Sequence, residues 1–156
     1  MNECPLCDIT AECMPLQHQD GLRVACTRCG EYLIHQSAIV ELEGRPRDQH
    51  ILSGITRVRS NQGSQTRISS DNIDDLLSSI AMPRDPQEVL DRFILHVGSK
   101  ARAFTDRVQL TPETDYPIAF ARKTEDFAYA LRHGRTSALV DTSGGAQLTG
   151  FRGYVV

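Results

Sequence analysis

The sequence lacks the features of several protein classes. It has no run of about 18 apolar residues, the length that a transmembrane helix requires. Its first residues include Glu3, Asp8 and His18, where a signal peptide needs an unbroken apolar stretch. We therefore expect a cytoplasmic protein with no membrane partner. A basic excess is missing too: the formal net charge is −3, whereas a strong nucleic-acid binder needs clustered Lys and Arg to neutralise phosphates.

Motifs of common enzymes are also missing. The chain contains neither H-E-x-x-H nor the deaminase pattern of H-x-E followed by P-C-x-x-C. No glycine-rich loop ends in a phosphate-binding Lys, and no nucleophile sits in a recognisable elbow. His35, His50, His96 and His133 could form a catalytic set with an aspartate only through the fold, because nothing in their spacing indicates one. We expect no enzymatic activity.

The most specific feature that is present is a set of paired cysteines. The pairs follow the spacing C-x2-C-x18-C-x2-C, which is typical of a four-thiolate zinc site. In a reducing cytosol such pairs favour metal binding over disulfides. Zinc suits these ligands better than calcium or magnesium, which prefer oxygen, and iron is the chemical alternative. The predicted metal ligands are Cys4, Cys7, Cys26 and Cys29.

The predicted zinc is structural. A closed set of four cysteines leaves no position for water or substrate, whereas a catalytic zinc keeps one open. Pro5 stiffens the first pair, and Gly30 directly after the second pair lets backbone amides approach the sulfur. Cys13 and His18 lie between the pairs, and we interpret them as a free thiol and a surface imidazole rather than as ligands.

The residues around the second cysteine pair predict a zinc ribbon, a small hairpin stapled by the metal. Leu22, Val24 and Cys26 alternate along one strand, and Tyr32 and Ile34 follow beyond the turn. A helical turn over 37–42 and a helix over 48–59 come next, and the polar stretch 60–65 is a break. The predicted domains are therefore 1–62 and 66–156, in an α+β fold.

The second domain reads as helices followed by a hairpin. Helices are predicted over 72–81, from Pro86 to a stop at Gly98, and from Thr124 to about Arg132, with Gly134 closing the last one. Asp85 caps the middle helix, with Pro at its first position and Glu at its third. Strands over 137–140 and 146–149 flank a Gly-Gly turn. This order predicts a winged helix with a C-terminal β-hairpin.

In a winged helix the helix before the hairpin often enters the major groove of DNA. On this chain that helix begins at Thr124, and its basic residues are candidate contacts for nucleic acid or a protein partner. The alternative interpretation is that they are charges on a solvated helix end, because the helix also carries Glu125 and Asp126. The candidate contacts are Arg122, Lys123, Arg132, His133 and Arg135.

Taken in order, the cysteine pairs, LSGITR at 52–57, DNIDDLL at 71–77 and DYPIAFARKTEDFAYAL at 115–131 resemble a recurring bacterial arrangement. It is similar to the zinc-ribbon plus winged-helix region that precedes effector domains in antiphage defence proteins, including ones with toll/interleukin-receptor domains. In that arrangement a Leu-Thr-x-x-Gly-aromatic phrase starts a further helix. Here residues 148–154 approximate the phrase with one extra residue. Either a third short strand replaces that helix, or the chain lacks the effector portion.

Two functions follow as expectations. The first is a binding or regulatory component of a defence assembly, in which zinc folds the first domain and the second recognises a protein partner or effector subunit. The second is a winged-helix regulator that binds duplex DNA directly. A continuous basic surface joining Arg57, Arg59 and Arg67 with the candidate contacts at 122–135 would favour the regulator.

Overall fold

A computed structural model describes residues 2–100, 108–121, 123–136 and 151–153 of the chain. Helices and strands both occur, so the fold class is α+β, as predicted. The chain divides into two compact units, Met1–Ala81 and Met82–Val156. This division differs from the predicted boundary at 62–66, because residues just after that boundary form a strand of the first unit's sheet. None of the described helices combines the length and the apolar character that crossing a membrane requires.

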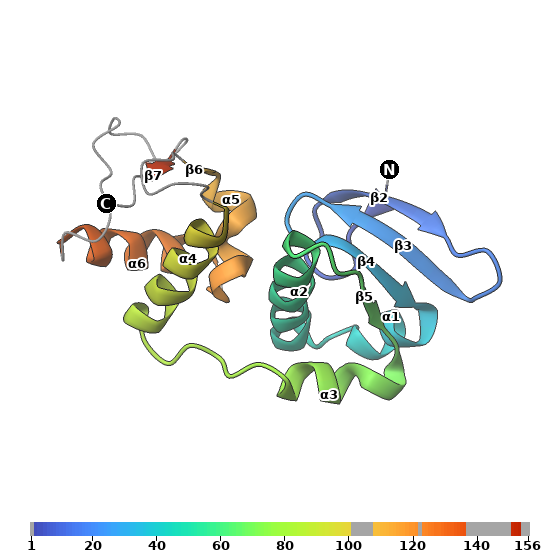
Figure 1. The fold of residues 1–156 in the computed structure, drawn as a ribbon. Coiled ribbons are helices and arrows are strands. Elements are labelled where there is room, and N and C mark those ends of the chain that lie inside the picture. Colours follow the sequence, from blue (N-terminus) through green and yellow to red (C-terminus); the bar gives the residue numbers. More distant parts are fainter. Residues whose placement is uncertain (1, 101–107, 122, 137–150, 154–156) are drawn as a thin grey trace. The chain divides into compact units, whose positions relative to one another are not determined.

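The first unit is built on a five-stranded sheet whose strands follow chain order across the sheet (Figure 1). The first four strands are antiparallel to their neighbours, and the fifth runs parallel to the fourth. The parallel step is made by two helices that connect the fourth strand to the fifth. The strands are β1 (Asn2–Glu3), β2 (Thr10–Pro15), β3 (Gly21–Cys26), β4 (Gly30–His35) and β5 (Thr66–Ile68).

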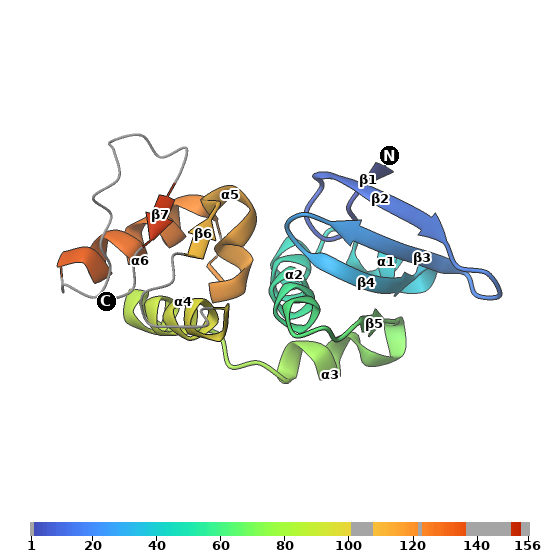
Figure 2. The same cartoon turned by 45° about the horizontal axis from the view of Figure 1, so that its top comes forward.

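The core of the first unit lies between one face of this sheet and helices α1 (Gln36–Leu42) and α2 (Pro46–Asn61) (Figure 2). Side chains alternate across a strand, so every second residue of the central strands faces the helices. A short 3-10 turn, η1 (Ser70–Asn72), and helix α3 (Ile73–Ser78) complete the unit. The side chains with at most 1% exposure include Val24, Tyr32, Ile34, Leu42, Leu52, Ile55, Ile68 and Ile73.

Several predicted elements of this unit are found and others differ. Helices over 37–42 and 48–59 are confirmed within a few residues. The segment between the cysteine pairs contains β2, where only Ala11 is buried, so it carries no apolar pattern that could have revealed a strand. Helix α3 ends at Ser78 rather than at residue 81, and at this end the hydroxyls of Ser78 and Ser79 donate to the carbonyls of Asp75 and Leu76. Such local side-chain bonds compete with continuation of a helix.

Within its described residues, the second unit contains three helices and a short two-stranded sheet. The strands pair in antiparallel fashion, with Gln109 opposite Arg152. Its short strand at 151–153 corresponds to one of the two alternatives that the sequence left open. The elements are α4 (Pro86–Lys100), β6 (Val108–Leu110), α5 (Pro112–Asp115), the 3-10 turn η2 (Tyr116–Ala119), α6 (Thr124–Thr136) and β7 (Phe151–Gly153).

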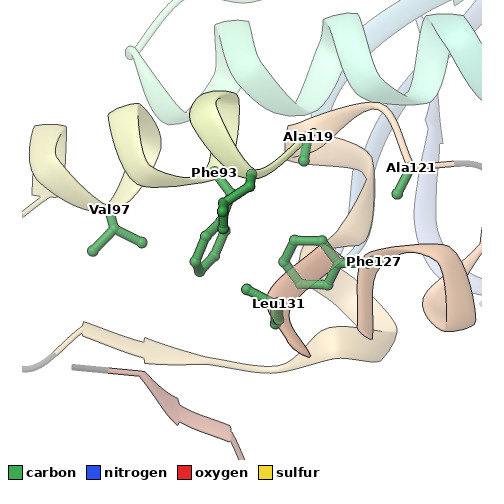
Figure 3. Packing of buried hydrophobic residues seen from close by; sticks show 7 residues of the cluster. Phe93, Val97, Ala119, Ala121, Phe127 and Leu131 are labelled. Atoms are coloured by element: carbon green, nitrogen blue, oxygen red, sulfur yellow. The ribbon is translucent and has the colours of Figure 1, made fainter. Parts of the chain in front are cut away.

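An aromatic pair lies at the centre of the second unit, between α4 and α6 (Figure 3). The rings of Phe93 and Phe127 meet edge to face, with centroids 5.1 Å apart and an interplanar angle of 76°. Leu131 packs beside them, as the periodicity predicted. The predicted cap of α4 is also confirmed, since the Asp85 carboxylate accepts the N–H of Glu88 at 2.9 Å.

The ends of two predicted helices and one segment predicted to be irregular differ from the structure. Helix α4 continues through Gly98 and helix α6 through Gly134, because a helical glycine costs only about 1 kcal/mol relative to alanine. The segment predicted as irregular contains β6, α5 and η2. The predicted hairpin over 137–140 and 146–149 lies outside the described residues.

Candidate metal centre

The four paired cysteines come together in the first unit. Their sulfur atoms all lie within 4.8 Å of one another. The Sγ atoms of Cys4 and Cys29 are 3.6 Å apart, as are those of Cys7 and Cys26. These separations are too long for a disulfide, whose bond is about 2.05 Å. They suit a tetrahedral ion, because Zn–S bonds of about 2.3 Å place the sulfurs about 3.8 Å apart.

Two similar turns present these sulfurs. In the first turn, the amides of Cys7 and Asp8 donate to the Cys4 carbonyl at 3.2 and 2.9 Å. In the second, the amide of Cys29 donates to the sulfur of Cys26 at 3.4 Å. The residue after each pair has left-handed backbone, with φ of 58° at Asp8 and 77° at Gly30. The left-handed step turns each chain back after its second cysteine, so both turns are preformed for a shared ion.

Two buried hydroxyl groups contact the sulfurs from outside the cluster. Tyr32 on β4 lies with its Oη 3.1 Å from the Sγ of Cys4, and Ser53 on α2 lies with its Oγ 3.1 Å from the Sγ of Cys29. Burial and then the negative charge at Cys4 raise the pKa of Tyr32 well above its ordinary value, so its hydroxyl keeps its proton and is able to donate to a thiolate at Cys4. Such outer contacts orient metal ligands and tune their basicity.

A polar stripe on helix α2 covers the two cysteine turns. Gln49 donates to the carbonyl of Pro5 in the first turn at 3.3 Å. Ser53 contacts Cys29, and Arg57 donates to the carbonyl of Thr27 in the second turn. Residues four apart lie on the same side of a helix, so these contacts come from one face. The centre is therefore bound to α2 as well as to the sheet.

The same helix explains the glycine after the second pair. Ser60, further along the polar stripe, accepts the amide of Glu31 on its Oγ at 2.9 Å. A Cβ added at Gly30 would lie 2.5 Å from the Cβ of Ser60, well inside van der Waals contact. Gly30 is thus required twice, by its positive φ and by the closeness of α2.

Hydrogen bonding among the sulfurs distributes their protons unevenly. The bond from Cys29 lowers the pKa of Cys26 well below that of an ordinary thiol. Hydrogen bonding to Cys26 correspondingly raises the pKa values of Cys7 and Cys29. The metal-free cluster therefore retains protons that a divalent cation must displace, so metal affinity should fall as the pH is lowered.

The two other candidate ligands lie outside the cluster. Cys13 is on β2, where its sulfur is 3.8 Å from the carbonyl oxygen of Glu3. His18 is exposed in the turn between β2 and β3, with a φ of 130°. Within the part of the chain that the structure describes, no further group of three His, Cys, Asp or Glu side chains is arranged to hold an ion.

The predicted contacts for nucleic acid or a partner are described only in part. Lys123 is exposed directly before α6, and Arg132 is exposed on that helix. Arg122 lies outside the described residues, and so do the side chains of His133 and Arg135, whose backbone belongs to α6. The sequence reasoning missed an exposed aromatic residue on α6, Tyr129, which shares the exposed side with Arg132 three residues later.

Sequence reasoning also missed the outer contacts of the metal centre. Tyr32 was read only as an apolar strand residue, and Ser53 was not singled out. The signal that could have found the stripe is the repeat of polar residues at 49, 53, 57 and 60, which places them on one face of a helix.

The chain matches no protein-family model, no curated protein sequence and no solved structure. The chemistry of the site therefore rests on its own geometry. Four cysteine sulfurs gathered by two turns, two of them in contact with buried hydroxyls, form a site that could hold one tetrahedral metal ion.

Proposed function

We propose that Cys4, Cys7, Cys26 and Cys29 hold one structural Zn²⁺, and that the chain is a non-catalytic binding or regulatory module. The observation that carries this proposal is the closed set of ligands. All four tetrahedral positions have a cysteine available, and Cys4 and Cys29 have no solvent exposure. Such a site offers a substrate no coordination position, and its metal contributes free energy to folding.

Elemental analysis of the purified chain tests the metal. We expect about one zinc per chain, retained by Cys13→Ser and lost from Cys29→Ser. Iron in place of zinc would preserve the site but change the assigned ion, because four thiolates bind both. Absence of any bound metal, or equal loss from the Cys13 variant, would refute the proposal.

The second unit is proposed to be a winged-helix module. Its described elements follow the order helix, strand, helix, helix, strand, and the two strands β6 and β7 pair with each other. Helix α6 then corresponds to the helix that a winged helix presents to its ligand.

The exposed side of α6 favours a protein partner over DNA. Its exposed residues include Glu125 and Asp126 in the first turn, followed by Tyr129 and Arg132. Two carboxylates at the start of the helix repel a phosphate backbone. Tyr and Arg are the residue types enriched where interfaces gain most of their binding energy. By the resemblance of the sequence, this partner is proposed to be an effector subunit of a bacterial antiphage defence assembly.

Affinity purification from the native host tests this function. We expect Tyr129→Ala to lose a partner that the unchanged chain retains, because the substitution removes an exposed aromatic side chain of the helix. The matched control is Gln87→Ala, an exposed residue on α4 of the same unit. Equal recovery of partners with Tyr129→Ala and Gln87→Ala would refute this surface.

A second function, direct binding of duplex DNA, is supported by the winged-helix order of elements. With three or four basic contacts, the log of the affinity should fall against the log of salt concentration with a slope of about −3. Replacing Arg132 and Arg135 together should flatten this slope by about two units. Submicromolar binding to random duplex at physiological salt, abolished by that double substitution, would place the DNA function first.

A further inference from the structure

The proposed metal site has two unequal sides. Cys4 and Cys29 are fully buried, with 0% exposure. Cys26 is exposed by 6%, and Cys7 is only partly buried. A small oxidant arriving from solvent therefore meets Cys7 first and reaches Cys26 beside it.

Hydrogen bonding follows the same division. The sulfurs of Cys4 and Cys29 each contact a buried hydroxyl, from Tyr32 and Ser53 respectively. Among the described contacts, no hydroxyl is bonded to the sulfur of Cys7 or Cys26. A donor that holds a thiolate lone pair makes that sulfur a weaker nucleophile, and oxidation follows thiolate character and exposure. The sulfur of Cys26 accepts the backbone amide of Cys29, at 3.4 Å. Burial and the hydroxyl contacts thus protect the same pair of sulfurs, Cys4 and Cys29.

The distances between sulfurs do not distinguish the pair Cys7 and Cys26 from the pair Cys4 and Cys29, because either pair is close enough to form a disulfide. The Cys7 and Cys26 sulfurs are 3.6 Å apart, and so are those of Cys4 and Cys29. Closing either gap to a disulfide of about 2.05 Å needs a movement of about 1.5 Å. Exposure and the hydroxyl contacts are therefore what separates the two pairs.

We propose that Cys7 and Cys26 are the oxidation-sensitive edge of the metal site, and that a hydroperoxide converts them to a disulfide with release of the ion. This inference rests on the proposed metal site. The Cys7 thiolate attacks a peroxide oxygen and becomes a sulfenic acid, while the departing hydroxide takes a proton to form water. The Cys26 thiolate then attacks the Cys7 sulfur, and the second hydroxide leaves as water after taking another proton.

The balance of this reaction explains the release. Two thiolates lose two electrons, one hydrogen peroxide is reduced, two protons are consumed and two waters form. The ion loses two of its four ligands, because a disulfide sulfur carries no thiolate charge. A thiol reductant restores both thiolates by exchange, so the change is reversible. Such a site would register peroxide as loss of the metal that joins the two cysteine turns.

The experiment begins with the metal-loaded chain, whose metal content is measured before oxidation. Hydrogen peroxide is then added in steps, released metal is measured with a chelating dye, and remaining thiols are alkylated. Trypsin cleaves after Arg23 and Arg28, which places Cys26 and Cys29 on different peptides. Cys4, Cys7 and Cys13 share one peptide and are assigned by fragmentation.

We expect one metal ion released for each Cys7–Cys26 disulfide, with Cys4 and Cys29 still alkylated and full reversal by a thiol reductant. Tyr32→Phe and Ser53→Ala should remove this selectivity, so that disulfides containing Cys4 or Cys29 appear. Cys13→Ser should leave the pattern unchanged. A chain without metal before oxidation would refute the site and this inference together. A loaded chain that forms mainly other disulfides, or releases metal without forming any, would refute the inference alone.

Discussion

The two units of the chain fill their centres with different chemistry. The first unit places four cysteines, a tyrosine hydroxyl and a serine hydroxyl where the sheet meets α2. The second places Phe93 against Phe127 between α4 and α6. Apolar side chains stabilise a core by leaving water, whatever else is bound. Sulfur ligands brought together without an ion gain little, so we expect the first unit to depend on a bound metal in addition to its apolar core, and the second unit not to.

Removal of the metal should produce the largest difference in stability between the two units. Cys29→Ser or a strong chelator should unfold the first unit, because a structural zinc contributes on the order of 10 kcal/mol to small zinc domains. Hydrogen exchange followed by mass spectrometry should then show lost protection in β2, β3 and β4 while α4 and α6 stay protected. Loss of protection in both units would mean that the second depends on the first.

A substitution in the aromatic core should destabilise the second unit and leave the metal site intact. Phe93→Ala should lower its free energy of unfolding by about 3 to 5 kcal/mol, because the ring is 2% exposed and its loss leaves a cavity against Phe127. Arg92→Ala should cost much less: the guanidinium lies 5.0 Å from the Phe120 ring centroid, a contact worth about 1 kcal/mol. Denaturant titration measures both. A reduced metal content in Phe93→Ala would contradict the independence of the units.

A pair of glycines isolates the contact between α2 and the second cysteine turn. Gly30 and Gly63 have nearly equal φ, 77° and 75°, but an added Cβ meets Ser60 at 2.5 Å only at Gly30. Replacement by Ala should cost about 1 to 2 kcal/mol at either site for the left-handed backbone. At Gly30 it should cost about 1 to 3 kcal/mol more for overpacking. Equal midpoints of thermal unfolding for Gly30→Ala and Gly63→Ala would show that α2 does not pack closely against the second cysteine turn.

The smallest expected effect sharpens the role of α2. Ser53→Ala removes a hydrogen bond to a ligand sulfur and should weaken metal binding by roughly 10- to 100-fold. Competition with a chelator of known affinity measures this change. Ser78→Ala, an exposed serine on α3, is the control and should leave the affinity unchanged. If the metal affinity of Ser53→Ala were unchanged, helix α2 would contribute to the site only by packing.

Sequence reasoning succeeded where a feature depends on residues that are close in the chain. The spacing of the cysteine pairs identified the cluster, and helical periodicity identified Phe93 and Phe127 as core residues. The cap at Asp85 also depends on neighbours only. The helical periodicity and the cap are each complete within a few turns of chain, and the two cysteine pairs are recognised by a known spacing, so no knowledge of the fold was needed.

The features that sequence reasoning missed depend on contacts across the fold. Ser53 and Arg57 are polar residues on a helix, a pattern that ordinarily indicates a solvent-facing side, yet they contact the cysteine turns. Strand β5 has only three residues, too few to show an alternating pattern, and its pairing with β4 follows from the tertiary arrangement. The same pairing places residues 66–68 in the first unit, whereas the sequence predicted a boundary at 62–66.

The parallel pairing of β5 with β4 has a consequence for synthesis of the chain. Strand β4 is finished at His35, but the strand that covers its open edge begins only at Thr66. At about 5 to 20 residues per second, the ribosome needs about 2 to 6 s to supply the missing segment. An uncovered strand edge invites pairing with other chains, so during those seconds the nascent hairpin is at its most vulnerable to aggregation. Early capture of metal by the cysteines, all of which precede His35, would shape the hairpin while its edge is still bare.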